Sequence, residues 1–480
     1  MRAVALLALL AACAHKPVPL NLPDADGHRA RPAPLAQRDF HPAQPVKHTL
    51  SNGVEVRIAA DDEVPLWSVR ALLRVGDYAD PQGKEGLAEV TLDMLNEGAG
   101  GLSAEAIGRT LTTLGSSLGT YADYDGGAVT TSGIVRNLEP TLDLFTAVLR
   151  EPDFPEDDWE LVRKRRLAQL RSDRESPDAI ARDVFRELLY GDAYRGRPTT
   201  EASLRNITTA DMRDWYKAHI GPQNLTLLVG GDVNATTLLP LLEARLASWS
   251  TPDLQTPPPS GAAILPKKEA IYLVDKPGAA QSVLRAGTVV GQRTDDDWFD
   301  FSMGSLVLGG AFSARMNMNL REDKGYTYGA RCGALADVYG PALWYCGASV
   351  QTAVTAPALS EMRREILEIR GDRPVTPEEL AYFQSYEVNG YPADHEEVDA
   401  LLGEQETMWR YGLPGDWPDR FLPGVQAVTT ESANQALQRH ILPDHLLWLV
   451  VGDRATVLPE LQALGLPIVE LNRDGSLKEN

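Results

Sequence analysis

The chain has 480 residues, so two or more domains are expected, and its composition of 43% hydrophobic and 24% charged residues is that of a globular protein. Acidic residues outnumber basic ones by 67 to 46. The resulting net charge of −21 argues against a nucleic-acid partner, because binding to a phosphate backbone relies on clustered Lys and Arg. Beyond the N-terminus no apolar run approaches the 18 residues of a membrane-spanning helix, so we predict that the body of the protein is soluble.

The first residues predict export. Arg2 supplies a positive charge, residues 3–12 form an apolar run that is too short to span a bilayer, and small residues precede Cys13. The sequence Leu-Ala-Ala-Cys at 10–13 resembles the lipobox of bacterial lipoproteins, which implies cleavage before Cys13 and a diacylglycerol group on its sulfur. An ordinary signal peptide with a chance cysteine is the alternative.

We therefore predict a lipoprotein-type signal peptide at 1–12 and a flexible tether at 13–45, which is rich in proline and polar residues. The protein is expected to be held in the bacterial cell envelope through this lipid anchor only. Because Ala14 rather than Asp follows Cys13, analogy with lipoprotein sorting favours the outer membrane, facing the periplasm.

The rest of the chain contains an internal repeat. In each copy a threonine precedes a predicted helix as its N-cap, a His-Ile-x-Pro sequence ends that helix, and an apolar strand with a Gly-Asp turn follows. The matched pairs, each 221 positions apart, are Thr208 and Thr429, His219 and His440, Pro222 and Pro443, and Asp232 and Asp453. The chain is therefore predicted to be a duplicated unit of about 220 residues.

Each copy begins with strand-like alternation, at 54–60 in the first and at 270–275 in the second, and continues with long helical segments before a last strand. Strands interrupted by paired helices, without regular βαβ alternation, indicate an α+β fold with antiparallel or mixed sheets. We predict an N-terminal domain at 46–249, a linker rich in Pro, Ser and Thr at 250–268, and a C-terminal domain at 269–470.

Cys332 and Cys346 lie in two strand-like segments, equally far from Tyr339 and the turn at Gly340-Pro341. In a hairpin of this register the two cysteines face each other across the strands. Since export places the chain in an oxidising compartment, we predict a disulfide between them. Two small buried thiols are the alternative.

Several segments together resemble the insulinase/pitrilysin family of metallopeptidases, the inverzincins. They include GLAEVTLDML at 86–95 and LGGAFSARMNMNLREDKGYTY at 308–328, and the resemblance extends over residues 46–465. It implies two homologous domains that face each other across a chamber. The family's motif is His-x-x-Glu-His on one helix face, where two imidazoles and a distal Glu hold zinc while the middle carboxylate activates water.

The residues at the four positions of this motif do not form a zinc site. Glu89 and Asp93 stand at the two His positions, Leu92 stands at the Glu position, and Gln169 is the best match to the distal Glu. We predict no metal, no cofactor and no catalytic residue in this chain. Glu89 and Asp93 could instead chelate a hard cation such as Mg²⁺, Ca²⁺ or Mn²⁺, or could be solvated residues that line an inactive cleft.

The second half keeps what the resemblance implies to be a substrate-binding segment. Arg321 and Tyr328 match the Arg and Tyr that reach the substrate near the zinc in this family, where they can polarise a peptide carbonyl. Gly309 and Gly310 would let the backbone approach a bound chain. The alternative is that Arg321 pairs with an acidic neighbour and that Tyr328 packs on a sheet.

No other constellation predicts an enzyme. The sequence from His395 to Asp399 begins like a His-Glu-x-x-His motif but ends in Asp, within a polar stretch. His219 and His440 occupy equivalent places in the two copies, so structural roles at helix ends explain them better than catalysis.

The altered zinc motif and the retained Arg321 and Tyr328 resemble the non-catalytic partner in two-subunit bacterial members of the family. We therefore predict a non-catalytic subunit that binds peptide substrates and completes the chamber of a partner carrying His-x-x-Glu-His, in a heterodimer or a larger complex. Two rivals remain. One is a stand-alone pseudo-peptidase that binds peptides or scaffolds an envelope assembly, and the other is an active enzyme with an unusual metal.

Overall fold

The computed structural model of the protein describes residues 40–42, 44–251, 254 and 263–478. The predicted signal peptide, the lipidation site Cys13, most of the predicted tether and part of the predicted linker lie outside the described residues. From His41 onward the chain forms one compact unit. Among the described residues no helix combines the length and the apolarity that crossing a membrane requires.

The first half of the chain contains a six-stranded sheet. In spatial order its strands are β1 (Val46–Thr49), β2 (Glu55–Ala60), β8 (Leu225–Gly231), β3 (Leu66–Leu73), β7 (Gly127–Ile134) and β6 (Ser117–Ala122). Strands β2 and β8 run parallel, and the other neighbours run antiparallel. Every residue of β8 is buried, as expected for an apolar strand at the centre of a sheet that is covered on both faces.

The second half contains another six-stranded sheet. Its order is β11 (Thr327–Leu335), β12 (Leu343–Gln351), β10 (Gln281–Val289), β13 (Leu447–Gly452), β9 (Ala270–Asp275) and β14 (Ile468–Leu471). Here β9 runs parallel to both of its neighbours, and the remaining pairs are antiparallel.

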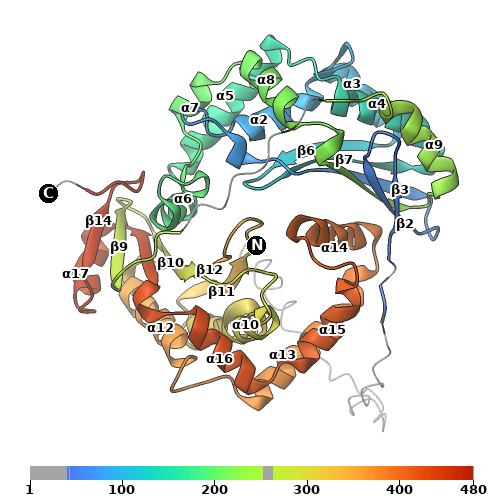
Figure 1. Ribbon diagram of the computed structural model, residues 1–480. Coiled ribbons are helices and arrows are strands. Elements are labelled where there is room, and N and C mark those ends of the chain that lie inside the picture. The colour runs from blue at the N-terminus through green and yellow to red at the C-terminus, as the bar shows by residue number, and fades with distance from the viewer. Residues whose placement is uncertain (1–39, 43, 252–253, 255–262, 479–480) are drawn as a thin grey trace, which may run out of the picture. The chain divides into compact units, whose positions relative to one another are not determined.

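Five strands of the two sheets follow the same path. Strands β2, β3, β6, β7 and β8 correspond to β9, β10, β11, β12 and β13 both in chain order and in spatial order. Only the sixth strand differs, because β1 comes before the repeated unit and pairs antiparallel with β2, whereas β14 comes after it and pairs parallel with β9. The predicted α+β fold, with two like halves and mixed sheets, is confirmed (Figure 1).

Helices surround both sheets (Figure 1). The first half contains α2 (Leu87–Asp93), α3 (Ala104–Leu114), α4 (Leu138–Arg150), α5 (Glu156–Asp173), α6 (Pro177–Tyr190), α7 (Glu201–Asn206), α8 (Thr209–His219) and α9 (Ala235–Leu246), with a short hairpin of β4 (Gly98–Ala99) and β5 (Leu102–Ser103). The second half contains α10 (Trp298–Ser305), α11 (Arg315–Asn317), α12 (Thr355–Glu368), α13 (Pro377–Gly390), α14 (Val398–Tyr411), α15 (Trp417–Ala427), α16 (Thr430–His440) and α17 (Arg454–Gln462), with π-helical turns η6 (Leu306–Gly310) and η7 (Met318–Asp323).

The helices repeat with the same offset as the strands. Helices α8 and α16 begin and end 221 positions apart, and Thr208 and Thr429 are their N-caps, each within a capping box. His219 is buried at the end of α8, and His440, at the end of α16, places Nε2 3.0 Å from Asp297 Oδ2. Both histidines therefore have structural contacts at helix ends.

Helices α6 and α14 are also equivalent, since both their first and their last residues lie 221 positions apart. Each of them packs on the sheet of the other half. Helix α6 contacts β10 and β13, and its Val184, Phe185 and Leu189 share a buried apolar cluster with Leu447 and Leu449. Burial of such side chains stabilises the contact by about 1.5–3 kcal/mol each.

Helix α14 makes the reciprocal contact with β8 and β3 of the first half. Its Leu402 and Trp409 form a buried cluster with Leu72 and Leu228, and the Trp409 indole Nε1 donates to Thr226 Oγ1 at 2.8 Å. The two halves are thus joined by an exchange of equivalent helices. Neither sheet is fully covered by its own half.

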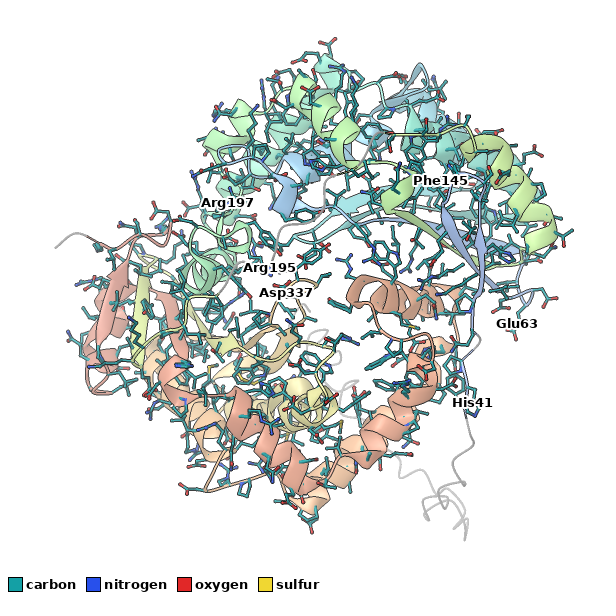
Figure 2. The ribbon with its side chains drawn as sticks, viewed as in Figure 1. His41, Glu63, Phe145, Arg195, Arg197 and Asp337 are labelled. Carbon is teal, nitrogen blue, oxygen red and sulfur yellow. A yellow bond between two sulfur atoms is a disulfide. The ribbon has the colours of Figure 1, made fainter. Side chains whose placement is uncertain are left out.

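A buried ion triad joins the halves at a second place (Figure 2). Arg195, in the connection between α6 and α7, lies between Asp125 of the first half and Asp337, which is in the loop between β11 and β12. Its Nε is 2.6 Å from Asp337 Oδ2, and its Nη2 donates to Asp125 Oδ2. All three residues are buried. Burial raises the pKa of Asp337, while the positive charge of Arg195 opposes that shift.

Arg195→Gln should destabilise the fold, because it leaves two buried carboxylates without a counter-charge. We expect the free energy of unfolding to fall by about 3–5 kcal/mol in chemical denaturation. Adding Asp125→Asn and Asp337→Asn removes all three charges together and should recover most of the loss. An Arg195→Gln protein as stable as the parent would show that the triad does not hold the halves together.

Candidate functional site

Helix α2 presents Glu89 and Asp93 one turn apart on one face. The helix begins after Gly86, whose φ of 94° is a left-handed conformation that favours glycine. The Asp80 carboxylate accepts hydrogen bonds from the backbone N–H groups of Gly86, at 2.7 Å, and Ala88, at 2.8 Å. These bonds satisfy N–H groups that a helix start leaves free, and so they orient the helix that carries the two acidic side chains.

A guanidinium lies between the two carboxylates. Arg166, on α5, has Nη1 2.7 Å from Glu89 Oε1, and its Nε donates to Asp93 Oδ2 at 2.8 Å. Its Nη2 donates to the same oxygen of Asp93. The planar fork of an arginine is suited to such charge-assisted contacts. The chain thus supplies its own cation between the residues that stand at the two His positions of the motif.

The other two positions of the motif have structural roles. Leu92 is fully buried in the core of the first half, so no group there can activate water. Gln169 donates from Nε2 to Asp173 Oδ1 at 2.8 Å. Asp93, Arg166 and Gln169 nevertheless line one pocket of about 500 Å³.

Glu89 and Asp93 are partly exposed, with side-chain exposures of 39% and 27%, and both also pair with Arg166. Arg166 is not among the site residues predicted from the sequence, although it precedes Gln169 by one helical turn. It belongs to a run of four basic residues at 163–166, which is more typical of a solvated helix face. In the part of the chain that the structure describes, no group of three or more His, Cys, Asp or Glu side chains could hold a metal ion.

Two carboxyl groups near α2, those of Glu89 and Asp77, have raised pKa values. Burial raises the pKa of Glu89, and the charge of Arg166 opposes that shift. Burial, followed by the charges of Glu89, Asp123 and Asp125, raises the pKa of Asp77 to about 7. The Oδ1 atom of Asp77 is buried and has no hydrogen-bond partner among the described residues.

Arg321 and Tyr328 lie in the second half. Arg321 Nε is 3.1 Å from Glu322 Oε1, and its guanidinium carbon lies 4.7 Å from the centre of the Phe312 ring. Tyr328, on the edge strand β11, is 90% exposed. The pairing of Arg321 with an acidic neighbour is therefore present, whereas packing of Tyr328 on the sheet is not.

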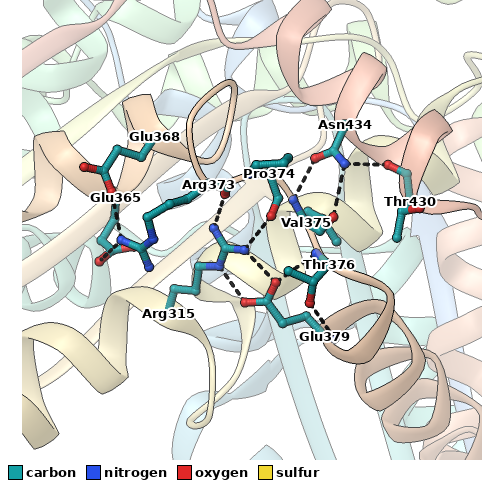
Figure 3. A network of polar contacts seen from close by, with 10 residues as sticks. All are labelled: Arg315, Glu365, Glu368, Arg373, Pro374, Val375, Thr376, Glu379, Thr430 and Asn434. Atoms are coloured by element: carbon teal, nitrogen blue, oxygen red, sulfur yellow. Dashed lines mark hydrogen bonds and ion pairs between the residues drawn. The ribbon is translucent and has the colours of Figure 1, made fainter.

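The segment that carries Arg321 is held by Arg315 of α11 (Figure 3). The Arg315 guanidinium binds both carboxylate oxygens of Glu379, with Nε 2.6 Å from Oε1, and donates to the carbonyl groups of Arg373 and Pro374. Glu379 also closes the capping box at the start of α13. These contacts connect the segment to α13.

Packing within the chain accounts for both glycines of this segment. Gly309 is buried, and a Cβ atom there would collide with the side chain and backbone of Cys332. Gly310 is exposed, and a Cβ atom there would lie 2.6 Å from Leu306 Cδ1. Cys332 itself is the cross-strand partner of Cys346, and a disulfide joins them.

The sequence from His395 to Asp399 does not form one helical face. His395 ends a 3₁₀ helix at Ala393–His395, and α14 begins only at Val398. The His395 ring is 2.7 Å from the Tyr391 carbonyl oxygen through Nδ1, and 3.1 Å from Glu404 through Nε2. These contacts support a structural role.

Comparisons with known proteins agree with this architecture. Residues 206–385 match the family described as "Peptidase M16 inactive domain". The chain is 18% identical over 425 residues to the "Non-peptidase homolog YmxG" of Helicobacter pylori, which covers 86% of this chain and 95% of that protein.

Two solved structures share the fold. The crystal structure of a peptidase M16 inactive domain from Pseudomonas fluorescens aligns with a TM-score of 0.78 and 22% identity, over 85% of this chain and 98% of the other. The periplasmic protease PqqL from Escherichia coli aligns with a TM-score of 0.73 and 16% identity, over 93% of this chain and 50% of the other.

The fold of two like halves is thus that of M16-type peptidases. The resemblance to insulinase/pitrilysin (M16) peptidases that was inferred from the sequence is confirmed. The matched segment 206–385 includes the part of the second half that carries Arg321 and Tyr328.

Restoring a zinc site should require a change at Arg166 as well as at the four motif positions. The quadruple variant Glu89→His, Leu92→Glu, Asp93→His, Gln169→Glu keeps a guanidinium between the two new imidazoles, so it should bind no stoichiometric zinc. Adding Arg166→Ser should permit zinc binding. Metal analysis after dialysis compares the two proteins. Equal zinc contents would show that Arg166 does not control the site.

Asp77→Asn should stabilise the protein at pH 8.5 and have little effect at pH 4. The folded pKa of about 7 is raised above the usual value of 3.8, so the folded state loses stability as the pH rises from about 4 to about 7, and asparagine removes this loss. The gain at pH 8.5 should be on the order of 1–3 kcal/mol. Thermal unfolding at both pH values measures it, with the exposed Asp62→Asn as the control. An effect that is the same at both pH values would contradict the prediction.

Proposed function

We propose that this protein is the non-catalytic subunit of an M16-type peptidase, binding peptide and completing the chamber of a partner chain that carries His-x-x-Glu-His. The observation that carries the proposal is the bridge from Arg166 to Glu89 and Asp93. A zinc ion would have to displace this guanidinium, and Leu92 offers no base to activate water.

The second half retains groups that can contact a peptide. The Tyr328 side chain is 90% exposed, and its phenol is free to donate to a carbonyl oxygen. The Arg321 side chain is 39% exposed, and its pair with Glu322 is a surface ion pair. Such pairs contribute only about 0–1 kcal/mol, so Arg321 can exchange Glu322 for a substrate carbonyl at little cost.

The relatives support a role beside another chain. The Helicobacter pylori protein is described as a non-peptidase homolog, and this chain covers half of PqqL, which is described as a periplasmic protease. A second M16-type chain would supply the other half of such an assembly. The export sequence and Cys13 support a lipid anchor in the outer membrane, with the protein facing the periplasm.

The proposal is tested by reconstitution with a purified M16-type partner that carries His-x-x-Glu-His, encoded in the same genome. Peptide cleavage by the mixture should exceed that by the partner alone at least about tenfold. Arg321→Ala should remove most of the increase, since removing one oxyanion-stabilising donor costs about 10²–10³ in rate. Tyr328→Phe, which removes only the hydroxyl, should also reduce it.

Two variants with exposed side chains in the same half serve as controls. Arg420→Ala removes a surface arginine that pairs with Asp416, and Tyr386→Phe removes the hydroxyl of a tyrosine that is 55% exposed. Both should leave the increase intact. If no such partner stimulates cleavage and the natively purified protein is a homo-oligomer, the proposal fails and a stand-alone peptide-binding or scaffold lipoprotein explains the chain better.

A further inference from the structure

A second pocket, of about 370 Å³, lies in the second half, apart from the motif positions on α2. Its volume falls within the range of pockets that bind small ligands, about 300–1,000 Å³. Its wall is formed by α10, by η6, by α15, by one side chain of α13 and by residues of β11. The side chains that matter for its chemistry are Arg293, Trp298, Phe299, Glu387, Trp417 and Phe421.

Arg293 has no anionic partner among the residues that the structure describes. No hydrogen bond or ion pair within the described residues involves its guanidinium, and its buried Nε is without a partner there. The guanidinium carbon lies 5.4 Å from the centre of the Tyr411 ring and 6.0 Å from that of Trp417. Burial lowers the pKa of Arg293, and the charge of Glu404 only partly opposes this shift. Among the described residues, this partly desolvated cation thus has no carboxylate in hydrogen-bond or ion-pair contact.

Two other inward-facing arginines, Arg195 and Arg315, differ in that respect. Arg195 contacts Asp125 and Asp337, and Arg315 contacts both carboxylate oxygens of Glu379. A guanidinium that is held between aromatic rings, with its fork unused, is suited to a planar anion that arrives from outside, and a carboxylate matches its geometry.

Much of the pocket wall is apolar and aromatic. The rings of Phe299 and Trp417 stack with their centres 5.2 Å apart, and Phe421 lies 6.0 Å from Phe299. A Cβ atom on Gly424 would lie 2.7 Å from the Phe299 ring, so glycine there permits the close approach of α15. Such a wall favours a ligand with a large apolar side chain.

Glu387 sets a third requirement for a ligand of this pocket, in addition to a carboxylate and a large apolar side chain. Its half-buried side chain has no hydrogen-bond or ion-pair partner among the described residues, and burial, together with the charge of Asp394, raises its pKa. The carboxyl group repels a second carboxylate but can accept a hydrogen bond from an N–H group. A fatty acid has no such donor, whereas the last residue of a peptide combines a carboxylate, an amide N–H and a side chain.

We propose that this pocket binds the C-terminal residue of a peptide, with its carboxylate on Arg293, its side chain on the Phe299 and Trp417 rings and its amide N–H on Glu387. The choice of a peptide rests on the proposed function, whereas the preference for a carboxylate does not. Peptides with a free C-terminus and an aromatic last residue would then be held in the second half.

A matched pair of probes tests this assignment. N-acetyl-Ala-Phe and N-acetyl-Ala-Phe-amide differ only in the carboxylate, and their binding to the full chain, without any partner, is measured by calorimetry and by the fluorescence of Trp298 and Trp417. The acid should bind about tenfold more tightly than the amide or better, as expected when a charge-assisted pair is lost. Arg293→Gln should reduce this ratio to within about twofold.

Two further variants distinguish the roles of the pocket residues. Phe299→Leu should weaken the binding of the acid probe and of the amide probe equally, so the ratio of their affinities should stay unchanged. The control Arg420→Gln should change neither affinity. Because Arg293 makes no hydrogen bond or ion pair within the described residues, Arg293→Gln should also leave the unfolding temperature unchanged or slightly raised, so that loss of binding cannot be attributed to misfolding.

Equal affinities of the parent protein for the two probes, or no binding of either, would overturn the assignment. A preference for the acid that survives in Arg293→Gln would do the same, because the carboxylate would then be recognised elsewhere. These measurements need no catalytic partner. If the reconstitution experiment fails, the binding measurements with the two probes can still be interpreted. If the probes do not bind as expected, the proposal of a non-catalytic subunit is unaffected.

Discussion

The structure depends on the reciprocal packing of α6 and α14. These helices are equivalent in the repeat, and each covers the sheet of the other half through a buried apolar cluster. The Arg195 triad adds a polar contact between the same halves. Because apolar burial is the dominant stabilising contribution, this packing holds the two halves together in one compact unit. The positions of the candidate sites within that unit follow from this exchange.

In the first half, an ion pair has replaced a metal-binding pattern without disturbing the helices that would carry it. The motif needs two side chains at i and i+4 on α2 and a third on α5. Glu89 and Asp93 stand at the first two positions and Gln169 at the third, and Arg166, one turn before Gln169 on α5, bridges the two carboxylates. A guanidinium between two carboxylates satisfies their charges, as a metal ion would satisfy those of its ligands, but it offers no open coordination position for water. The fold can therefore be kept while the hydrolytic chemistry is lost.

The sequence was sufficient to predict what is local or repeated. The offset of 221 positions and the threonine caps predicted the matching helices, and hairpin periodicity placed Cys332 opposite Cys346. It was not sufficient to predict Arg166, because the choice of an ion-pair partner 73 positions away depends on how α2 and α5 pack. The exchange of α6 and α14 was also missed, since an amphipathic pattern shows which face of a helix is buried but not which sheet buries it.

The exchange has a consequence for the order in which the chain can fold during synthesis. Helix α6 is complete at Tyr190, yet Leu447 and Leu449, which cover its apolar face, are made only after more than 250 further residues. Translation at about 5–20 residues per second leaves this face uncovered for roughly ten seconds or longer. An exported chain avoids premature collapse if it is kept unfolded until it has crossed the membrane. Contacts of such long sequence separation also favour slow folding of the first half.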